Sequence, residues 1–474
     1  MSLLHQTKFP AHIFRAYDIR GKLEHLTPAT IAAIATALAR LYIKKQVKQL
    51  VLGYDARLTS PSYAAIFETI LIQHGIDVIA LGCCSTPMMY FFSGQYAGNG
   101  IMITASHNPK TDNGVKWVCH AEPPSPEQIQ ALALDAAQIS QSMNSASVSE
   151  VTHQFYPVFA KQYLDYLQQD IQLKRPLKII VDGLHGSAGQ YAIEILMRLG
   201  CQWTALNCEA NGHFPKHAPD PSKDHHLIEL KNQVIEQQAD LGFALDGDGD
   251  RVVIVDDLGQ IISADRLLCL FAQICLLRHP QHEIVFDVKC SNQVTQFVAA
   301  HQGIATMIRT GSTFLRKYIA QSKQQVVFGG EYAGHYVFND GRGRGYDDGL
   351  YAALRVLEYL SEHTQPLSQL MQHIPQRFST QDCYISTHQH ASKALLSLIE
   401  ENCHSMQAKL TQIDGVRLDF EDGFGIIRAS NTGEYLTVRF DADTAPRLEQ
   451  IRQNFAAIFN SDYPDIAQEI RQAY

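Results

Sequence analysis

The chain of 474 residues is too long for one hydrophobic core, and its length predicts three or four domains. Apolar residues make up 46% and charged residues 18%, as in ordinary soluble globular proteins; the net charge of −9, without basic runs, argues against nucleic acid or an anionic membrane as the main partner. The ten cysteines show no C-x-x-C spacing. This lack of paired spacing predicts reduced thiols. The sequence also shows no signal-peptide pattern and no apolar stretch of membrane-spanning length, so we expect a cytoplasmic protein.

The N-terminal part of the chain alternates strand and helix patterns. An extended segment ends in a turn at Gly21, and Thr27 then acts as N-cap of a helix that begins at Pro28. A second helix begins at Ser60 and ends at Gly75. Strands are predicted over residues 50–53, 78–81 and 100–103. This alternation predicts a mostly parallel sheet.

The same pattern recurs twice along the chain. Apolar runs ending in Asp182 and Asp287 are each followed by a helix, which predicts three related α/β domains. Residues 140–151, rich in Ser and Asn, are expected to link the first two domains. The last domain differs, with an α+β pattern of one helix, three strands and a closing helix. Its elements are expected at residues 392–410, 415–418, 424–429, 436–440 and 444–460.

A serine loop, Thr104 to Pro109, follows the strand at residues 100–103. Asn108 and Pro109 break the chain there, so Ser106 is expected on an exposed loop at the carboxyl end of the strand, where open α/β sheets place ligand chemistry. Ser106 is the candidate nucleophile. His107 beside it could orient a phosphoryl group or move a proton, or it could simply be exposed to water.

An acidic loop carries three alternating carboxylates, Asp246, Asp248 and Asp250. Three carboxylates that converge need a cation between them, and oxygen ligands alone favour Mg²⁺. An EF-hand is excluded because Arg251 stands where that loop needs glycine, and Asp257 where it needs glutamate. Arg251 is instead expected to face Ser106.

Three further stretches carry candidate binding groups. Lys116 follows a predicted turn at residues 112–114, which would fold it back toward the serine loop. Glu331 and His335 follow a strand at residues 326–328 and suit sugar hydroxyls. A loop near residue 430 provides a guanidinium, two hydroxyls and an amide that suit a phosphate. Its residues are Arg428, Ser430, Asn431 and Thr432.

In this order, the serine, acidic and phosphate loops resemble those of the α-D-phosphohexomutases, and most closely the bacterial phosphomannomutase/phosphoglucomutase branch. The likeness extends from Phe9 to about Phe459. It implies an α/β protein of four domains around a central cleft, with three related mixed-sheet domains and a C-terminal α+β lid. We expect their boundaries at residues 1–152, 153–256, 257–373 and 374–474.

The resemblance implies a hexose 1-phosphate to hexose 6-phosphate mutase whose Ser106 carries a phosphoryl group, with Mg²⁺ on Ser106 and the three aspartates. A 1,6-bisphosphate intermediate would turn around in the cleft, and glucose 1,6-bisphosphate would serve as activator. Arg20, Lys116, His107 and Arg251 would assist transfer. The residues that would bind the sugar are Tyr17, Lys289, Ser312, Glu331, Ala333 and His335. The expected state is a monomer or weak dimer.

Three departures from the family pattern fall in the binding loops: Ala333 where Ser is commoner, Ser312 where close relatives carry His, and Gly433 in the phosphate loop. They leave the preference for mannose or glucose open. Asn431 favours this branch over phosphoglucosamine mutase, which stays the alternative within the family. A phosphosugar phosphatase or a non-catalytic phosphosugar-binding protein are the alternatives of another class.

Overall fold

The computed structural model describes residues 9–141, 153–387, 390–403, 406–429 and 435–473. The chain divides into two compact units. Unit 1 comprises the chain up to Ile262 together with Ala333–Val337 and Arg342–Leu370. Unit 2 comprises Ser263–Tyr332, Phe338–Gly341 and the chain from Met371 onward. The predicted central cleft, which would involve both units, stays a prediction.

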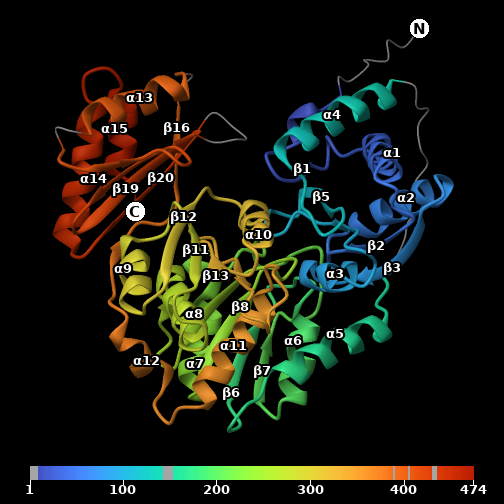
Figure 1. Cartoon of the computed structure of the whole chain (residues 1–474), viewed down its shortest axis with the longest axis horizontal. Coiled ribbons are helices and arrows are strands. Elements are labelled where there is room, and N and C mark those ends of the chain that lie inside the picture. Colours follow the sequence, from blue (N-terminus) through green and yellow to red (C-terminus); the bar gives the residue numbers. More distant parts are fainter. Residues whose placement is uncertain (1–8, 142–152, 388–389, 404–405, 430–434, 474) are drawn as a thin grey trace. The chain divides into compact units, whose positions relative to one another are not determined.

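The first sheet of unit 1 has the strand order β1-β5-β4-β2-β3 and is mixed. The central strands β4, β2 and β3 are parallel, whereas β5 runs antiparallel to both β4 and β1. Helices α1, α2 and α4 bury a continuous apolar core with these strands, and α3 packs on β2 and β4 (Figure 1). The strands are β1 (Ile19–Lys22), β2 (Gln49–Tyr54), β3 (Asp77–Cys83), β4 (Gly100–Ile103) and β5 (Asp112–Val118); the helices are α1 (Pro28–Lys44), α2 (Ser60–Gln73), α3 (Thr86–Ser93) and α4 (Pro126–Ser140).

Local sequence explains the first helix. The Thr27 side chain accepts a hydrogen bond from the Thr30 N–H, and Pro28 occupies the first turn, where its missing N–H costs nothing. Both features match the prediction.

Two turns predicted in this region are strands instead. Gly21 lies inside β1, paired with Asn113, and a Cβ atom there would come within 2.6 Å of Ile13 Cγ2. The glycine therefore permits close packing rather than a turn. Residues 112–114 begin β5. Pairing on both sides, with β1 and β4, overrides the turn tendency of Asp-Asn-Gly.

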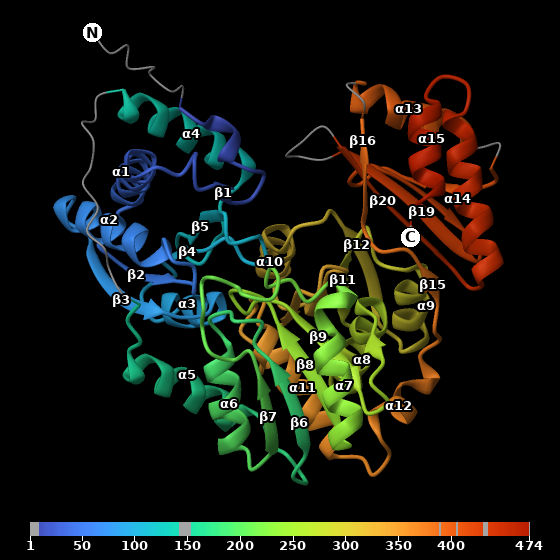
Figure 2. The same cartoon turned by 180° about the vertical axis from the view of Figure 1, so that it is seen from behind.

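The second sheet of unit 1 has the order β10-β9-β8-β6-β7. Strand β6 lies between β7 and β8, parallel to both, and β9 runs antiparallel to β8. Helix α7 packs on β6 and β8, as Figure 2 shows, and α11 packs on β8 and β9. The elements are α5 (Pro157–Asp170), β6 (Lys178–Asp182), α6 (Gly189–Arg198), β7 (Gln202–Leu206), α7 (Ile228–Gln237), β8 (Leu241–Leu245), β9 (Val252–Asp256), β10 (Ile261–Ile262), α11 (Gly349–Ser361) and α12 (Leu367–Leu370).

In unit 2, strand β11 lies between β12 and β13 and is parallel to both. The elements of this region are α8 (Ala264–Arg278), β11 (Glu283–Asp287), α9 (Asn292–Ala300), β12 (Ile304–Ile308), α10 (Ser312–Gln321) and β13 (Val326–Gly330), with β14 (Tyr336–Phe338) next in the chain. Strands β2, β6 and β11 thus hold equivalent places, each between two parallel neighbours. Each ends at or just before an aspartate, Asp55, Asp182 or Asp287. This confirms the predicted threefold repeat.

The last domain contains an antiparallel sheet with the strand order β15-β20-β19-β18-β17, and β16 also pairs with β20. Helices α13, α14 and α15 pack against this sheet and complete its hydrophobic core. The elements are β15 (Phe378–Ser379), β16 (Cys383–Ser386), α13 (Ser392–Asn402), β17 (Lys409–Thr411), β18 (Val416–Phe420), β19 (Gly423–Ala429), β20 (Tyr435–Ala442), α14 (Ala445–Phe459) and α15 (Pro464–Arg471). The α+β prediction is confirmed, but the long helix predicted to residue 410 is wrong. Leu410 pairs with Leu418 in the sheet, so α13 ends at Asn402.

Within the described residues, no helix combines the length and apolar character that a bilayer crossing requires.

Candidate active site

The serine loop follows β4 and is fixed by its own side chains. The Ser106 N–H donates to Thr104 Oγ1 at 2.8 Å, and that hydroxyl donates to Asp55 Oδ2 at 2.7 Å. Ser106 has φ +52°, a left-handed conformation that a residue with a side chain adopts at a cost of about 1–2 kcal/mol. The loop therefore holds Ser106 in a strained conformation supported by buried hydrogen bonds.

Ser106 is buried rather than exposed, with only 1% of its surface accessible. The prediction of an exposed loop is wrong because the acidic loop of the second domain covers it: the Ser106 hydroxyl donates to Asp246 Oδ2 at 2.7 Å. Gly247 of the acidic loop lies against the serine loop, and a Cβ atom there would come within 2.4 Å of the Ser106 carbonyl oxygen.

Arg57 fixes the backbone of the serine loop. The sequence alone did not identify this residue. Its guanidinium donates to the backbone carbonyls of Ser106 and Asn108, both at 2.7 Å, and its Nε donates to Asp55 Oδ2 at 3.0 Å. Its side chain is almost fully buried. In the sequence, Arg57 stands two residues after Asp55, the aspartate that follows a strand. From that position its side chain reaches the backbone of the serine loop.

The acidic loop connects the antiparallel strands β8 and β9. Asp246, Asp248 and Asp250 are almost completely buried, and one carboxylate oxygen from each lies within 4.8 Å of the others. Neighbouring segments fix the loop: the Thr86 N–H donates to the Asp248 carbonyl at 2.8 Å, and the Thr86 hydroxyl donates to Asp248 Oδ2 at 2.5 Å. The convergence expected from the sequence is therefore present in unit 1.

Lys116, on β5, forms two ion pairs with the acidic loop. Its Nζ lies 2.7 Å from Asp248 Oδ2 and 2.6 Å from Asp250 Oδ2. Burial would lower the pKa of Lys116, but the Asp248 and Asp250 carboxylates raise it well above its ordinary value, so the side chain is an ammonium at neutral pH.

The three carboxylates differ in their proton affinity. Burial raises the pKa of Asp246 well above its ordinary value, and the neighbouring Asp250 and Asp248 carboxylates raise it further. Burial alone would also raise the pKa of Asp250, but the Lys116 ammonium outweighs it and keeps that pKa below its ordinary value. Lys116 pairs with only two of the three buried carboxylates, so the cluster favours further positive charge.

The donor set suits Mg²⁺. All three ligands offer oxygen, and Asp248 Oδ1 and Asp250 Oδ1 are buried without a hydrogen-bond partner among the described residues. A buried carboxylate oxygen left without a donor is costly, and a bound cation removes that cost.

Arg20 contacts the serine loop, and His107 belongs to it. Arg20 donates to Asp18 Oδ2 at 2.6 Å and to Asn108 Oδ1 at 3.1 Å. His107 Nδ1 lies 3.3 Å from the Ser106 hydroxyl. Burial, followed by the nearby Arg251 and Arg20 charges, lowers the pKa of His107 well below its ordinary value. The ring is therefore neutral at pH 7 and able to accept a proton.

Arg251 and His335 form a second contact in unit 1. The Arg251 Nε donates to His335 Nε2 at 2.9 Å, and the Arg251 N–H donates to Asp246 Oδ1 at 3.2 Å. Burial would lower the pKa of Arg251, but Asp246 and Asp250 raise it. Of the other predicted sugar residues in this unit, Tyr17 is 38% exposed and Ala333 is half-buried.

Unit 2 carries the remaining predicted binding residues that are described. Glu331 Oε1 accepts from the Gly311 N–H at 2.5 Å, next to Ser312 at the start of α10. Lys289 donates to Asp382 Oδ2 at 2.5 Å. The Arg428 Nη2 donates to Asp414 Oδ2 at 2.7 Å. The predicted phosphate ligands Ser430, Asn431 and Thr432 lie outside the described residues.

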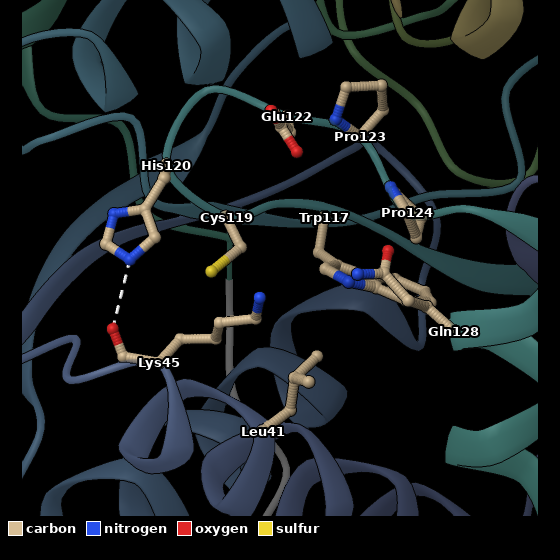
Figure 3. Close-up of a pocket in the computed structure, with 9 residues that line it drawn as sticks. All are labelled: Leu41, Lys45, Trp117, Cys119, His120, Glu122, Pro123, Pro124 and Gln128. Atoms are coloured by element: carbon tan, nitrogen blue, oxygen red, sulfur yellow. Dashed lines mark hydrogen bonds between the residues drawn. The ribbon is translucent and has the colours of Figure 1, made fainter.

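A cavity of about 210 Å³ lies elsewhere in the first domain (Figure 3). It is lined by Trp117, Leu41, Pro123 and Pro124, with Lys45 and His120 among its polar residues. None of the predicted site residues lines it. Trp117 follows Lys116 on β5, and successive side chains of a strand point to opposite faces, so the cavity is separated from the serine loop by the sheet.

Comparison with known proteins agrees with this geometry. All four domains described for phosphoglucomutase/phosphomannomutase match in order: the α/β/α domain I at residues 11–143, domain II at 161–259, domain III at 263–378 and the C-terminal domain at 390–458. A phosphomannomutase/phosphoglucomutase of Pseudomonas syringae pv. tomato is 37% identical over 96% of this chain and 97% of its own. A phosphoglucomutase of Neisseria gonorrhoeae is 36% identical over 95% and 97%.

A solved structure extends the likeness to three dimensions. A phosphoglucomutase/phosphomannomutase family protein from Burkholderia thailandensis superposes with a TM-score of 0.86 at 31% identity, over 96% of this chain and 98% of that one. The predicted resemblance, fold class and enzyme class are confirmed. With matching domains over most of its length, this chain belongs to the phosphoglucomutase/phosphomannomutase family.

Proposed function

We propose that this protein interconverts hexose 1-phosphates and hexose 6-phosphates through a phosphorylated Ser106. The observation that carries the proposal is the buried Ser106 hydroxyl, which donates to Asp246 beside a cluster of three carboxylates and the Lys116 ammonium. Phosphoryl transfer depends on positioning and charge stabilisation, and this arrangement provides both.

Asp246, Asp248 and Asp250 would hold Mg²⁺, together with an oxygen of Ser106 or its phosphoryl group. When bound, the ion neutralises charge on the transferring phosphoryl group. We propose Mg²⁺ as the metal because the ligands are oxygen atoms only.

In the forward reaction, the free hydroxyl of the hexose 1-phosphate attacks the phosphorus on Ser106. The new phosphorus–oxygen bond to the sugar forms as the bond to Ser106 Oγ breaks, and the sugar hydroxyl loses its proton. We assign that proton to His107, because its Nδ1 lies 3.3 Å from the Ser106 hydroxyl. Lys116 remains an ammonium and stabilises charge together with Arg20 and Arg251. The protonated His107 then returns the proton to Ser106 Oγ, 3.3 Å away, so that the serine leaves as a neutral hydroxyl.

The resulting hexose 1,6-bisphosphate then turns around and returns its other phosphate to Ser106, which leaves the 6-phosphate as product. We assign sugar contacts to Tyr17, Lys289, Ser312, Glu331, Ala333 and His335. The non-transferring phosphate would be bound by Arg428 with Ser430, Asn431 and Thr432. Glucose 1,6-bisphosphate would phosphorylate an enzyme that has lost its phosphoryl group. The ten cysteines, all among the described residues, form no disulfide. We expect a cytoplasmic protein that is a monomer or weak dimer.

The test is phosphorus NMR of the purified protein with Mg²⁺, a trace of glucose 1,6-bisphosphate and either mannose 1-phosphate or glucose 1-phosphate. Conversion to the 6-phosphate is expected for the unsubstituted protein and not for Ser106→Ala. The two rates give the sugar preference. An increasing signal of free inorganic phosphate would instead identify a phosphatase. Conversion of glucosamine phosphate, without conversion of either hexose phosphate, would identify a phosphoglucosamine mutase.

A further inference from the structure

The start of helix α3 lies against the acidic loop, within unit 1. Ser85 is the N-cap of this helix: its side chain accepts a hydrogen bond from the Met88 N–H, and Pro87 occupies the first turn. An N–H group in the first turn of a helix has no partner inside that helix, and Thr86 donates its N–H to the Asp248 carbonyl at 2.8 Å. Thr86 and Asp248 are both fully buried. The start of the helix and the loop are therefore joined through their backbones, away from water.

The two oxygens of the Asp248 carboxylate have different surroundings. Oδ2 accepts hydrogen bonds from the Thr86 hydroxyl at 2.5 Å and from the Lys116 ammonium at 2.7 Å. Oδ1 is buried and accepts no hydrogen bond from any residue that the structure describes. Because two donors on one oxygen restrict rotation of the carboxylate, Oδ1 is the oxygen that remains for a cation.

The two donors to Asp248 Oδ2 respond differently to a bound cation. The Lys116 ammonium sits on a flexible side chain and also lies 2.6 Å from Asp250 Oδ2, so a cation that binds to these carboxylates repels it. The Thr86 hydroxyl carries no net charge, and its β-branched side chain has few rotamers. Thr86 is therefore the donor that keeps its hold on Asp248 when the metal binds.

We propose that Thr86 is a positioning residue that acts through Asp248 on the divalent cation. Its hydroxyl holds Oδ2, so that Oδ1 is presented to the cation together with Asp246 and Asp250. The inference rests on the metal-binding role proposed above for the three aspartates, but not on transfer of a phosphoryl group. It gives the first domain a part in a site whose three carboxylates all belong to the second.

Binding of Mn²⁺, measured by electron paramagnetic resonance with Mg²⁺ as competitor, tests the proposal without turnover. Thr86→Val keeps the branched shape and removes the hydroxyl, and it should raise the Mn²⁺ dissociation constant on the order of 10-fold, as when a partner of a metal ligand is lost. Thr86→Ser keeps the hydroxyl and should stay within about threefold of the unsubstituted protein. Unchanged or tighter binding in Thr86→Val, or equal losses in both variants, would overturn the proposal.

Ser85→Ala is the matched control. It removes the neighbouring hydroxyl and the N-cap of the same helix, but the Ser85 side chain accepts from Met88 rather than donating to Asp248. We expect a lower midpoint of thermal unfolding and a Mn²⁺ dissociation constant within about twofold of the unsubstituted value. A loss of Mn²⁺ affinity as large as that of Thr86→Val would overturn the proposal, because it would show that the start of α3 as a whole, not the Thr86 hydroxyl, positions the carboxylate.

The mutase assay gives a second reading of the same variants. In Thr86→Val, the Mg²⁺ concentration for half-maximal rate should rise by the same factor as the Mn²⁺ dissociation constant, and saturating Mg²⁺ should restore most of the rate. A lower rate at saturating Mg²⁺ with an unchanged half-saturation would overturn the proposal. If the unsubstituted protein binds Mn²⁺ but converts no hexose phosphate, the proposed function fails while the comparison of Thr86 variants still stands. If it binds neither cation, the metal assignment and the role of Thr86 fail together.

Discussion

Gly247 sets the distance between the acidic loop and the serine loop, and Gly247→Ala tests how much that distance matters. Its added Cβ would lie 2.4 Å from the Ser106 carbonyl oxygen, whereas ordinary van der Waals contact begins at 3.4 Å. The loops must separate by roughly 1 Å (3.4 Å less 2.4 Å) or distort to a similar extent. Since a displacement of about 1 Å can cost on the order of 100-fold in rate, we expect kcat/KM to fall by about that factor.

The assay is phosphorus NMR or a coupled assay for the 6-phosphate, with thermal unfolding measured alongside. Gly247 does not adopt a positive φ, so alanine adds bulk without backbone strain. Gly200→Ala is the matched control: it has φ +75° and no atom within 4 Å of the added Cβ, so it should cost about 1 kcal/mol of stability and leave kcat/KM unchanged. Full activity and an unchanged unfolding midpoint in Gly247→Ala would refute the spacing argument.

Three further predictions follow from the described contacts. Arg57→Met leaves the buried Asp55 carboxylate without its cationic partner and should lower the free energy of unfolding by about 3–5 kcal/mol in chemical denaturation; a loss below about 1 kcal/mol would contradict the anchoring role. Burial raises the pKa of Asp348 from 3.8 to about 6, so its stabilising contribution is complete below about pH 4 and is lost as the pH rises through about 6. The difference in unfolding midpoint, Asp348→Asn minus the unsubstituted protein, should therefore be larger at pH 7 than at pH 4.5 in thermal unfolding. A difference that does not change with pH would refute this. Arg428→Ala should raise KM about tenfold or more with a smaller change in kcat, as expected for loss of a charged phosphate contact; an unchanged KM would remove Arg428 from the phosphate site.

Local sequence determined much of this protein. Thr27 and Pro28 begin α1 where predicted, and the apolar runs that end at Asp55, Asp182 and Asp287 are strands in equivalent positions of three sheets. Side-chain caps and strand patterns act over a few residues, so they can be recognised without tertiary contacts. The serine and acidic loops could also be predicted, because their residue types and order match a family.

Only the tertiary structure decided the rest. The Asp-Asn-Gly at residues 112–114 is a strand because two neighbouring strands pair with it, and Leu410 leaves the predicted helix because β18 pairs with it. Ser106 is buried because the acidic loop, 140 residues away in the chain, covers it. Arg57 was missed for the same reason: it donates to the backbone of a loop that is distant in sequence. Such contacts depend on which loops the packed sheets bring together, and no local pattern encodes that.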